Sequence, residues 1–193
     1  MLENLEKYEI LLASKSPRRR ELLTQMRIPF KPVSLGGIDE SYPPTLPATE
    51  VPLFIANRKA DAYMRMIRDN ELIITADTLV ILGDRIMGKP KDREDAVDML
   101  LTLAGKTHQV VSGVCIMTKD RRKTFTVTTD VNFANLTREE VEYYVDSFQP
   151  FDKAGAYGIQ EWIGCVAVKS IEGSFYNVMG LPVHQLYNEL KDF

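Results

Sequence analysis

The chain has 193 residues, of which 45% are hydrophobic and 26% are charged, a composition typical of a soluble globular protein. Its net charge of −3 argues against broad binding to nucleic acids, and no apolar run approaches the roughly 20 residues that a membrane-spanning helix needs. The N-terminus has no basic segment followed by an apolar one, so we expect no signal peptide and a cytoplasmic location. We expect Cys115 and Cys165 to be small buried residues in a reducing compartment.

Hydrophobic periodicity and turn residues divide the first half of the chain into alternating strands and helices. The predicted elements there are a strand over 10–13, a helix from Pro17, a loop or edge segment over 32–48, a helix over 49–68 and a strand over 72–82. Ser16 is the predicted N-cap of the first helix, with Pro17 at its first position. The tripeptide Gly83-Asp84-Arg85 predicts a hairpin turn after the long strand.

The second half of the chain continues this alternation. The predicted elements there are a helix from about Arg93, strands over 107–117 and 123–133, a helix after Thr137, a hairpin over 164–180 and a helix over 182–191. Asp92 is the predicted N-cap of the helix near 93, and Thr137 with Glu140 forms a capping box. The hairpin has Glu172-Gly173 at its predicted turn. Together the elements predict one α/β or α+β domain with a mixed sheet.

The stretch "ILLASKSPRRRELL" predicts an anion site, because a strand leads through a tight turn into a helix N-terminus whose first N–H groups lack helical partners. Ser14 and Ser16 add hydroxyl groups there. Arg18 and Arg19 fall in the first helical turn, where cations oppose the helix dipole, so stability alone does not favour them. We interpret both as phosphate contacts and Arg20 as a solvated residue.

The run "IITADTLV" places Asp77 among apolar residues, where a carboxylate is costly unless it is paired, hydrogen-bonded or bound to metal. The simplest interpretation is an aspartate that caps a turn at the end of a strand. Asp39-Glu40 in a loop and Lys89 in "MGKPKD" supply further parts of a metal-assisted phosphate site. Lys59 could join them, or it could face solvent from its helix.

The motifs of this chain, in this order, resemble those of the Maf proteins, which are nucleoside triphosphate pyrophosphatases. They are "LLASKSPRRRELL", "ADT" at 76–78, "GKPKD" at 88–92, "LAGKTHQVVSGV" at 103–114, "DKAGAYGIQ" at 152–160 and "VMGLP" at 178–182. The resemblance implies an α/β fold similar to that of ITPases, with a mixed, twisted sheet flanked by helices. It implies a single domain over residues 1–193, with two lobes around a nucleotide-binding cleft, and assembly into a dimer.

The implied activity is hydrolysis of a nucleoside triphosphate to the monophosphate and pyrophosphate, by attack of water on the α-phosphorus with Mg²⁺ or Mn²⁺ present. Asp77 matches a general base or, on another view, a metal ligand, and Glu40 matches an acidic position that we assign to metal. The implied substrate-binding residues are Ser14, Arg18, Arg19, Lys59, Thr78, Lys89 and Gln160. Arg18, Thr78 and Gln160 match positions that tune base specificity.

"GAYGIQ" together with Thr78 resembles the subclass that acts on dTTP and UTP. The amide of Gln160 offers a donor and an acceptor, which suits the carbonyl and N–H edge of thymine and uracil. Glu161 adds negative charge near the expected base pocket, and Trp162 either stacks on a base or belongs to the core. Tyr157 either packs under the loop or lines the pocket, and Asp152 with Lys153 forms a salt bridge or contacts the ligand.

Two other functions fit the same residues. One is a nucleotide-binding regulator of cell division with little catalysis, and the other is an enzyme of this family with a different base specificity, such as 7-methyl-GTP. The retention of Asp77, Glu40, Lys89 and Arg18 favours an enzyme over a regulator. An RNA-binding module is disfavoured by the net charge and by the lack of aromatic residues between the basic ones.

Overall fold

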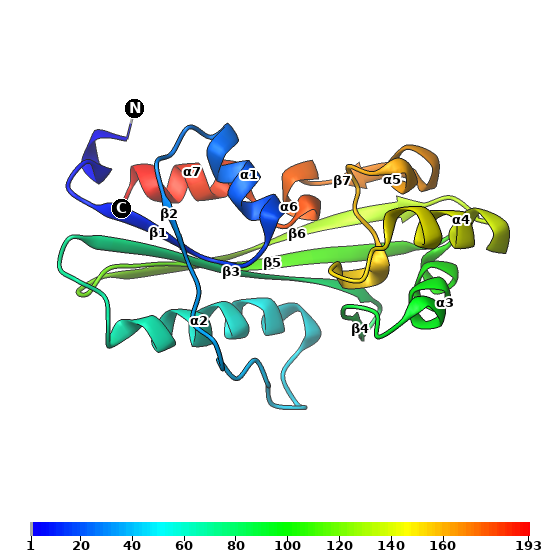
Figure 1. The fold of residues 1–193 in the computed structure, drawn as a ribbon, viewed down its shortest axis with the longest axis horizontal. Helices are drawn as coiled ribbons and strands as arrows, with labels where there is room; N and C mark the ends of the chain where they lie inside the picture. The colour runs from blue at the N-terminus through cyan, green and yellow to red at the C-terminus, as the bar shows by residue number, and fades with distance from the viewer. Residues whose placement is uncertain (1) are drawn as a thin grey trace. The chain divides into compact units, whose positions relative to one another are not determined.

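The computed structural model describes residues 2–193 (Figure 1), and these residues form two compact units. The first unit comprises the described residues through Asp77, Ser112–Val127 and Gly180–Phe193, and the second comprises Thr78–Val111 and Thr128–Met179. Within the described chain, seven strands form a mixed sheet with the order β2-β1-β3-β5-β6-β7, and β4 pairs with β3. The predicted α/β class, with helices flanking a mixed sheet, is therefore confirmed. The expectation of a single domain with two lobes around a cleft stays a prediction.

In the first unit, β1 (Glu9–Ala13) lies between β2 (Lys31–Val33) and β3 (Glu71–Leu82), and both neighbours run parallel to it. The helix α1 (Pro17–Gln25) connects β1 to β2, and α2 (Val51–Met64) connects β2 to β3. Figure 1 shows α1 on one face of these strands and α2 on the other. The two connections thus leave in opposite directions, which makes the carboxyl end of β1 a topological switch point. Open parallel sheets bind ligands at such a point.

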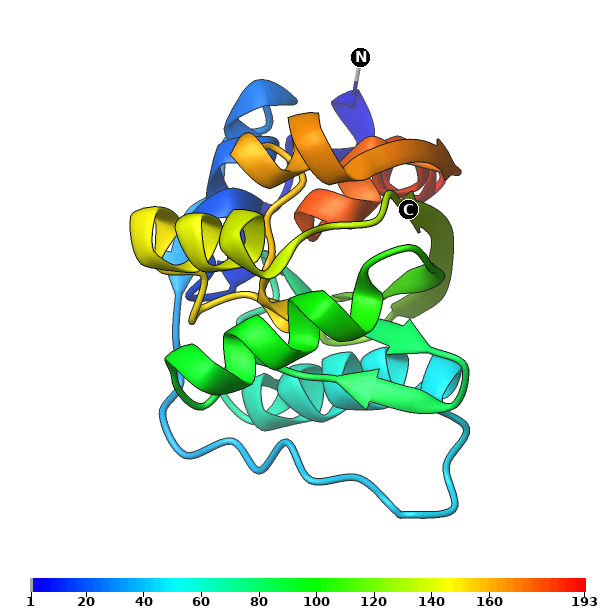
Figure 2. The same cartoon turned by 90° about the vertical axis from the view of Figure 1, so that its right-hand side faces the viewer.

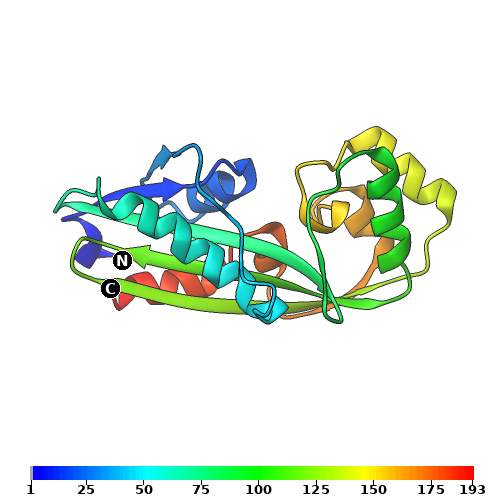
Figure 3. The ribbon, with the colours of Figure 1, turned by 90° about the horizontal axis from the view of Figure 1, so that it is seen from below.

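The segment between β2 and α2 is the loop that the proline-rich sequence predicts. In Figure 3 this loop runs from β2 across α2 and then leads into the start of that helix. Its apolar residues Leu35 and Ile38, together with Val33 at the end of β2, pack on a buried cluster that includes Tyr63 and Ile67.

The helix predicted over 49–68 is shorter in the structure. A 3-10 turn, Ala48–Glu50, precedes α2, and the helix ends at Met64. The chain then turns toward β3, where the backbone N–H of Arg68 donates to Glu71 Oε2 at 2.8 Å. Ile67 therefore reaches the core from a turn rather than from the helix face.

The helix α2 packs closely on β5 (Thr107–Met117) at Gly113. A Cβ on Gly113 would lie 2.2 Å from the backbone nitrogen of Leu53 and 2.5 Å from the carbonyl carbon of Pro52. Such distances do not occur between real atoms, and backbone atoms cannot move aside as a flexible side chain can. Gly113 is therefore required for the closeness of strand and helix.

We expect Gly113→Ala to lower the free energy of unfolding by about 3 kcal/mol or more, because the added methyl group forces α2 away from β5. Urea denaturation followed by circular dichroism measures this change. Gly36→Ala is the matched control, since a Cβ there meets nothing within 4 Å, and we expect it to stay within about 1 kcal/mol of the wild type. A loss below about 1 kcal/mol for Gly113→Ala would show that the helix yields easily.

In the second unit, β3 turns at Gly83 into the antiparallel strand β4 (Arg85–Met87), and Gly83 has φ of 60°. This is the hairpin turn that the sequence predicts. The helices α3 (Arg93–Leu103) and α4 (Arg138–Phe148) pack side by side, as Figure 2 shows, and Arg93 Nε contacts Asp146 Oδ1 at 2.6 Å. Both predicted caps are confirmed: Asp92 caps α3, and Thr137 with Glu140 forms the capping box of α4.

The hairpin predicted over 164–180 is wrong. This segment forms the helix α5 (Trp162–Ala167), the strand β7 (Val168–Glu172) and the helix α6 (Phe175–Met179). β7 pairs with β6 (Arg122–Phe133), so it has a partner without a second strand from its own segment. In α6, the buried side chain of Asn177 donates to Val110 O and to Thr129 Oγ1, both at 3.0 Å. These distant contacts override the local β propensity.

The two cysteines differ in burial. Cys115 on β5 is buried, and burial raises the pKa of its thiol to about 11. The prediction for Cys165 is wrong, because this residue is exposed. The helix α5 buries Ile163 and Ala167, which are four residues apart and share a face. Cys165 lies midway between them in sequence and faces solvent.

The last helix, α7 (Val183–Lys191), agrees with the helix predicted over 182–191 and buries Leu186 and Leu190. It belongs to the first unit, where Figure 1 shows it on the same face of the strands as α1. Asn4 Nδ2 donates to Leu190 O at 2.8 Å and so joins the two ends of the described chain. Among residues 2–193, the helices are too short or too polar for any of them to cross a bilayer.

Below the loop 152–160, His108 is buried and its Nε2 lies 2.7 Å from Tyr157 Oη. Burial lowers the pKa of His108 from 6.5 to about 4, and the charge of Asp130 opposes this shift. Phe133 and Tyr157 pack edge-on against the imidazole. His108 is therefore a neutral core residue in the folded protein at neutral pH.

We expect the free energy of unfolding to fall as the pH drops from 6.5 to about 4, by roughly 3 kcal/mol from His108 alone. In this window the unfolded chain binds a proton on His108 and the folded chain does not, so acid favours unfolding. Urea denaturation at several pH values measures the slope for the wild type and for His108→Gln. The variant should lose this part of the slope, and equal slopes would contradict the assignment.

Candidate active site

The carboxyl end of β1 leads directly into the N-terminus of α1. Ser16 caps this helix, because its hydroxyl accepts a hydrogen bond from the backbone N–H of Arg19 at 3.4 Å, and Pro17 occupies the first turn as predicted. The buried Ser14 hydroxyl accepts from the backbone N–H of Ser16 at 3.2 Å. The helix N-terminus and two hydroxyl groups therefore lie together at the switch point, an arrangement that suits an anion.

Arg19 connects three segments of the first unit. Its Nε donates to Gly180 O at 2.8 Å, and its Nη1 donates to Ala76 O at 2.9 Å and to Ser14 Oγ at 3.4 Å. Burial lowers the pKa of this guanidinium, and the nearby carboxylate of Asp77 opposes the shift. Arg19 thus fixes the backbone next to Asp77 and places a positive charge there.

The two neighbouring arginines have different surroundings. Arg18 is half-buried in the same helical turn as Arg19. Arg20 is exposed, which agrees with its interpretation as a solvated residue. Its Nη2 also donates a hydrogen bond to Ser14 O at 3.3 Å.

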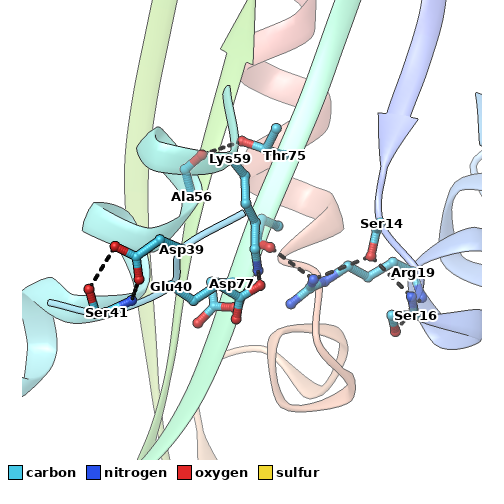
Figure 4. A network of polar contacts seen from close by, with 11 residues as sticks. Ser14, Ser16, Arg19, Asp39, Glu40, Ser41, Ala56, Lys59, Thr75 and Asp77 are labelled. Carbon is cyan, nitrogen blue, oxygen red and sulfur yellow. Dashed lines mark hydrogen bonds and ion pairs between the residues drawn. The ribbon is translucent and has the colours of Figure 1, made fainter. Parts of the chain in front are cut away.

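Lys59 joins the two carboxylates that the sequence analysis singled out. Its Nζ lies 2.8 Å from Asp77 Oδ1 and 3.2 Å from Glu40 Oε1 (Figure 4). The side chains of Lys59 and Asp77 are each 14% exposed, whereas that of Glu40 is 56% exposed. Asp77 is therefore paired, as its place among apolar residues demands, and Lys59 faces the site rather than solvent.

This convergence follows from the periodicities of β3 and α2. Thr75 and Asp77 are two residues apart and share a face of β3, while Ala56 and Lys59 are three apart and share a face of α2. Thr75 Oγ1 donates to Ala56 O at 2.7 Å, and the long side chain of Lys59 reaches Asp77 Oδ1 on the same face of β3 at 2.8 Å. Because β1 ends at Ala13, which pairs with Thr75, Asp77 extends beyond the end of β1.

Glu40 is held in place by a turn that sequence reasoning missed. Asp39 Oδ1 accepts from the backbone N–H of Ser41, and its Oδ2 accepts from Ser41 Oγ, both at 2.9 Å. Arg58 contacts Asp39 Oδ2 at 3.1 Å and donates to Ser41 O at 2.8 Å. The Ser41 hydrogen bonds and then the Arg58 charge lower the pKa of Asp39. The sequence signal for this turn was the pair of adjacent basic residues Arg58 and Lys59 on α2, because both contact the loop that carries Asp39 and Glu40.

Glu40 and Asp77 present carboxylate oxygens, which are the donors that Mg²⁺ and Mn²⁺ prefer. Among residues 2–193, no group of three or more His, Cys, Asp or Glu side chains is arranged to hold a metal ion. Mg²⁺ and Mn²⁺ are commonly held by one or two carboxylates, with water and substrate phosphates as the other ligands. Glu40 and Asp77, which both contact the Lys59 ammonium group, fit that pattern when a triphosphate supplies the further oxygen ligands.

In the second unit, "GKPKD" and "DKAGAYGIQ" lie side by side. The backbone N–H of Gly155 donates to Gly88 O at 3.0 Å, next to the exposed Lys89. Gly155 has φ of 68°, and a Cβ there would lie 2.9 Å from Val80 Cγ2, so the loop requires glycine at this position.

Several open alternatives for this loop are resolved by its contacts. Lys153 Nζ contacts Asp152 Oδ1 at 2.8 Å, which favours the salt bridge. Tyr157 is buried against His108 and therefore packs under the loop. Trp162 is half-buried and packs edge-on against the exposed Tyr143, so it does not belong to the buried core.

The predicted site residues thus fall into two groups. The first unit brings together Ser14, Arg19, Glu40, Lys59 and Asp77, with Arg18 in the same turn as Arg19. The second unit carries Thr78, half-buried on β3, together with the exposed residues Lys89 and Gln160.

Nearly the whole chain is similar to known proteins. A family model described as "Maf-like protein" matches residues 9–193. A dTTP/UTP pyrophosphatase of Bacteroides thetaiotaomicron is 54% identical over 191 residues, which cover 99% of each chain. Another from Parabacteroides distasonis is 56% identical over 193 residues, which cover 100% of each chain.

Among solved structures, a HAM1 protein from Coxiella burnetii aligns with a TM-score of 0.51 and 15% identity, covering 96% of this chain and 100% of that one. This likeness concerns the fold alone. The family match begins at the first residue of β1 and includes every predicted site residue. The chain therefore belongs to the Maf family.

Proposed function

We propose that this protein is a nucleoside triphosphate pyrophosphatase that hydrolyses dTTP and UTP to the monophosphate and pyrophosphate. The names of relatives at 54% and 56% identity support this substrate class. The observation that carries the proposal is the contact of Lys59 with both Asp77 and Glu40, beside a helix N-terminus at the carboxyl end of β1. A cation between two carboxylates, next to an anion site, suits chemistry on a charged phosphate chain.

Several groups would hold the triphosphate in this proposal. The phosphate oxygens would be bound by the N–H groups at the start of α1 and by the Ser14 hydroxyl. Their negative charge would be offset by the positive charges of Arg18, Arg19 and Lys59. Lys89, in the second unit, adds a further positive charge to the proposed set. Fixed charges of this kind stabilise the transition state of phosphoryl transfer without reorganising.

Asp77 acts in this proposal on the water that attacks the α-phosphorus. Its Oδ1 is held by Lys59, which fixes the direction in which Oδ2 points. The carboxylate serves as the general base for that water or as a metal ligand, and both roles need this orientation. When bound, Mg²⁺ or Mn²⁺ would be held by Glu40 and Asp77 and would offset the charge of the triphosphate.

Gln160 is the proposed base-reading residue. It is exposed within the loop that carries "GAYGIQ", and its amide can donate to a ring carbonyl and accept from the ring N–H of thymine or uracil. Thr78 and Arg18 are the other proposed specificity residues. We also propose that the protein is cytoplasmic and that it forms a homodimer. Light scattering on the purified protein measures its molecular mass and so tests the dimer.

The test is release of pyrophosphate from a panel of nucleoside triphosphates in ¹⁸O-labelled water, with Mg²⁺, with Mn²⁺ and with a chelator. We expect metal-dependent turnover of dTTP and UTP, with the label in the monophosphate because water attacks the α-phosphorus. Label in pyrophosphate would contradict that attack. Turnover of another nucleotide, such as 7-methyl-GTP, would overturn the base assignment. Tight nucleotide binding without turnover would favour the regulator.

A further inference from the structure

The residue proposed to read the base occupies the tip of a four-residue turn, Gly158–Glu161. The turn is closed by a hydrogen bond from the backbone N–H of Glu161 to Gly158 O at 3.0 Å. Ile159 is buried beneath it, whereas Gln160 is exposed. The position of Gln160 therefore depends on what holds the two ends of this turn.

Both ends of the turn are bound by one hydroxyl group, that of Tyr144 on α4. Its oxygen accepts a hydrogen bond from the backbone N–H of Gly158 at 3.1 Å and donates to the carboxylate of Glu161. Tyr144 is fully buried, and burial together with this hydrogen bond raises the pKa of its hydroxyl above the usual range. The hydroxyl thus stays protonated and keeps donating to Glu161.

The carboxylate of Glu161 is fixed from a second side by Lys153. The other oxygen, Oε1, lies 3.2 Å from Lys153 Nζ, which also pairs with Asp152. A Cβ on Gly158 would lie 3.0 Å from Glu161 Cδ and 3.1 Å from Lys153 Cε, so the backbone lies tightly against this pair. The carboxylate of Glu161 is therefore directed into the loop, where Lys153 and Tyr144 contact it.

We propose that Tyr144 and Glu161 are positioning residues that set base specificity by fixing the turn that presents Gln160; this inference rests on the proposed function. A carboxamide can turn over and exchange its donor and acceptor, and cytosine presents the reverse pattern to thymine at the same two positions. Discrimination between the two bases therefore depends on where Gln160 places its amide against the ring. The network that binds both ends of its turn fixes the backbone from which this amide extends.

The test compares kcat/KM for dTTP with kcat/KM for dCTP in the wild type and in Tyr144→Phe. This variant keeps the ring stacked on Phe148 and removes only the hydroxyl. We expect the ratio to fall by about tenfold to a hundredfold, chiefly through a higher KM for dTTP, since small misplacements of binding groups have effects of this size. Tyr143→Phe is the matched control, because Tyr143 is exposed on the same helix, and it should leave the ratio unchanged.

A second pair of variants keeps the proposal testable if Tyr144→Phe does not fold. Glu161→Ala removes the acceptor at the other end of the turn and should lower the ratio similarly. Glu161→Gln retains an acceptor for Tyr144 and should restore most of the selectivity. An unchanged ratio in folded, active Tyr144→Phe or Glu161→Ala would overturn the proposal while leaving the proposed function intact. Wild-type protein that releases no pyrophosphate from dTTP would overturn both.

Discussion

Replacing Asp77 by asparagine should lower kcat for dTTP hydrolysis by about a thousandfold or more, while the affinity for nucleotide changes by less than about tenfold. Asparagine has nearly the same shape and can still contact Lys59, so the fold is retained. It cannot accept the proton of the attacking water, and its neutral amide oxygen is a weaker metal ligand than a carboxylate. Asp77 is 14% exposed and bonded to Lys59 through one oxygen, so water replaces the lost group poorly.

Steady-state pyrophosphate release gives kcat for this variant, and calorimetric titration with a non-hydrolysable dTTP analogue gives the affinity. Asp61→Asn is the matched control, because Asp61 lies on α2 in an exposed ion pair with Arg122. A titration with Mn²⁺ separates the two roles: partial recovery at high metal concentration indicates a ligand, and none indicates a base. Unchanged turnover would remove Asp77 from the mechanism.

Replacing Lys59 by methionine should lower kcat/KM for dTTP by about a hundredfold to a thousandfold. The change leaves the carboxylates of Asp77 and Glu40 facing the triphosphate without the cation that now contacts both. Lys59 is 14% exposed, so its charge acts in a partly desolvated setting where it is worth more than on the surface. Methionine keeps the length and apolar stem of the lysine side chain.

The same kinetic assay measures the loss, and circular dichroism confirms that the variant is folded. Lys119→Met is the control, since Lys119 forms an exposed pair with Asp69 and should not affect turnover. A loss of less than about tenfold for Lys59→Met would contradict the central place given to this ammonium group.

The sequence predicts those parts of the fold that depend on nearby residues. Ser16, Asp92 and Thr137 each bond to a backbone N–H three residues later, so their helices could be found from short windows. The segment over 164–180 could not, because α6 is fixed by Asn177, whose partners Val110 and Thr129 are 67 and 48 residues away. No local pattern carries that information.

The candidate site likewise contains residues that the sequence could indicate and residues that it could not. Asp77 could be singled out because a carboxylate in an apolar run needs a partner, and the structure supplies Lys59. The spacings of 56 with 59 and of 75 with 77 place Lys59 and Asp77 on the facing sides of α2 and β3, but the contact itself depends on the direction in which the lysine side chain extends. Tyr144 could not be found this way. It reads as a core position of an amphipathic helix, and its hydroxyl contacts appear only once the loop is folded against it.

The bond from Arg19 to Gly180 has a consequence for the biosynthesis of the protein. A chain emerging from the ribosome displays every residue assigned to the chemistry once residue 160 is out, yet Arg19 still lacks one of its carbonyl partners. Gly180 and α7 belong to the first unit and reach it last, after the whole second unit has been made. A chain released before residue 180 therefore carries an incomplete framework around Asp77.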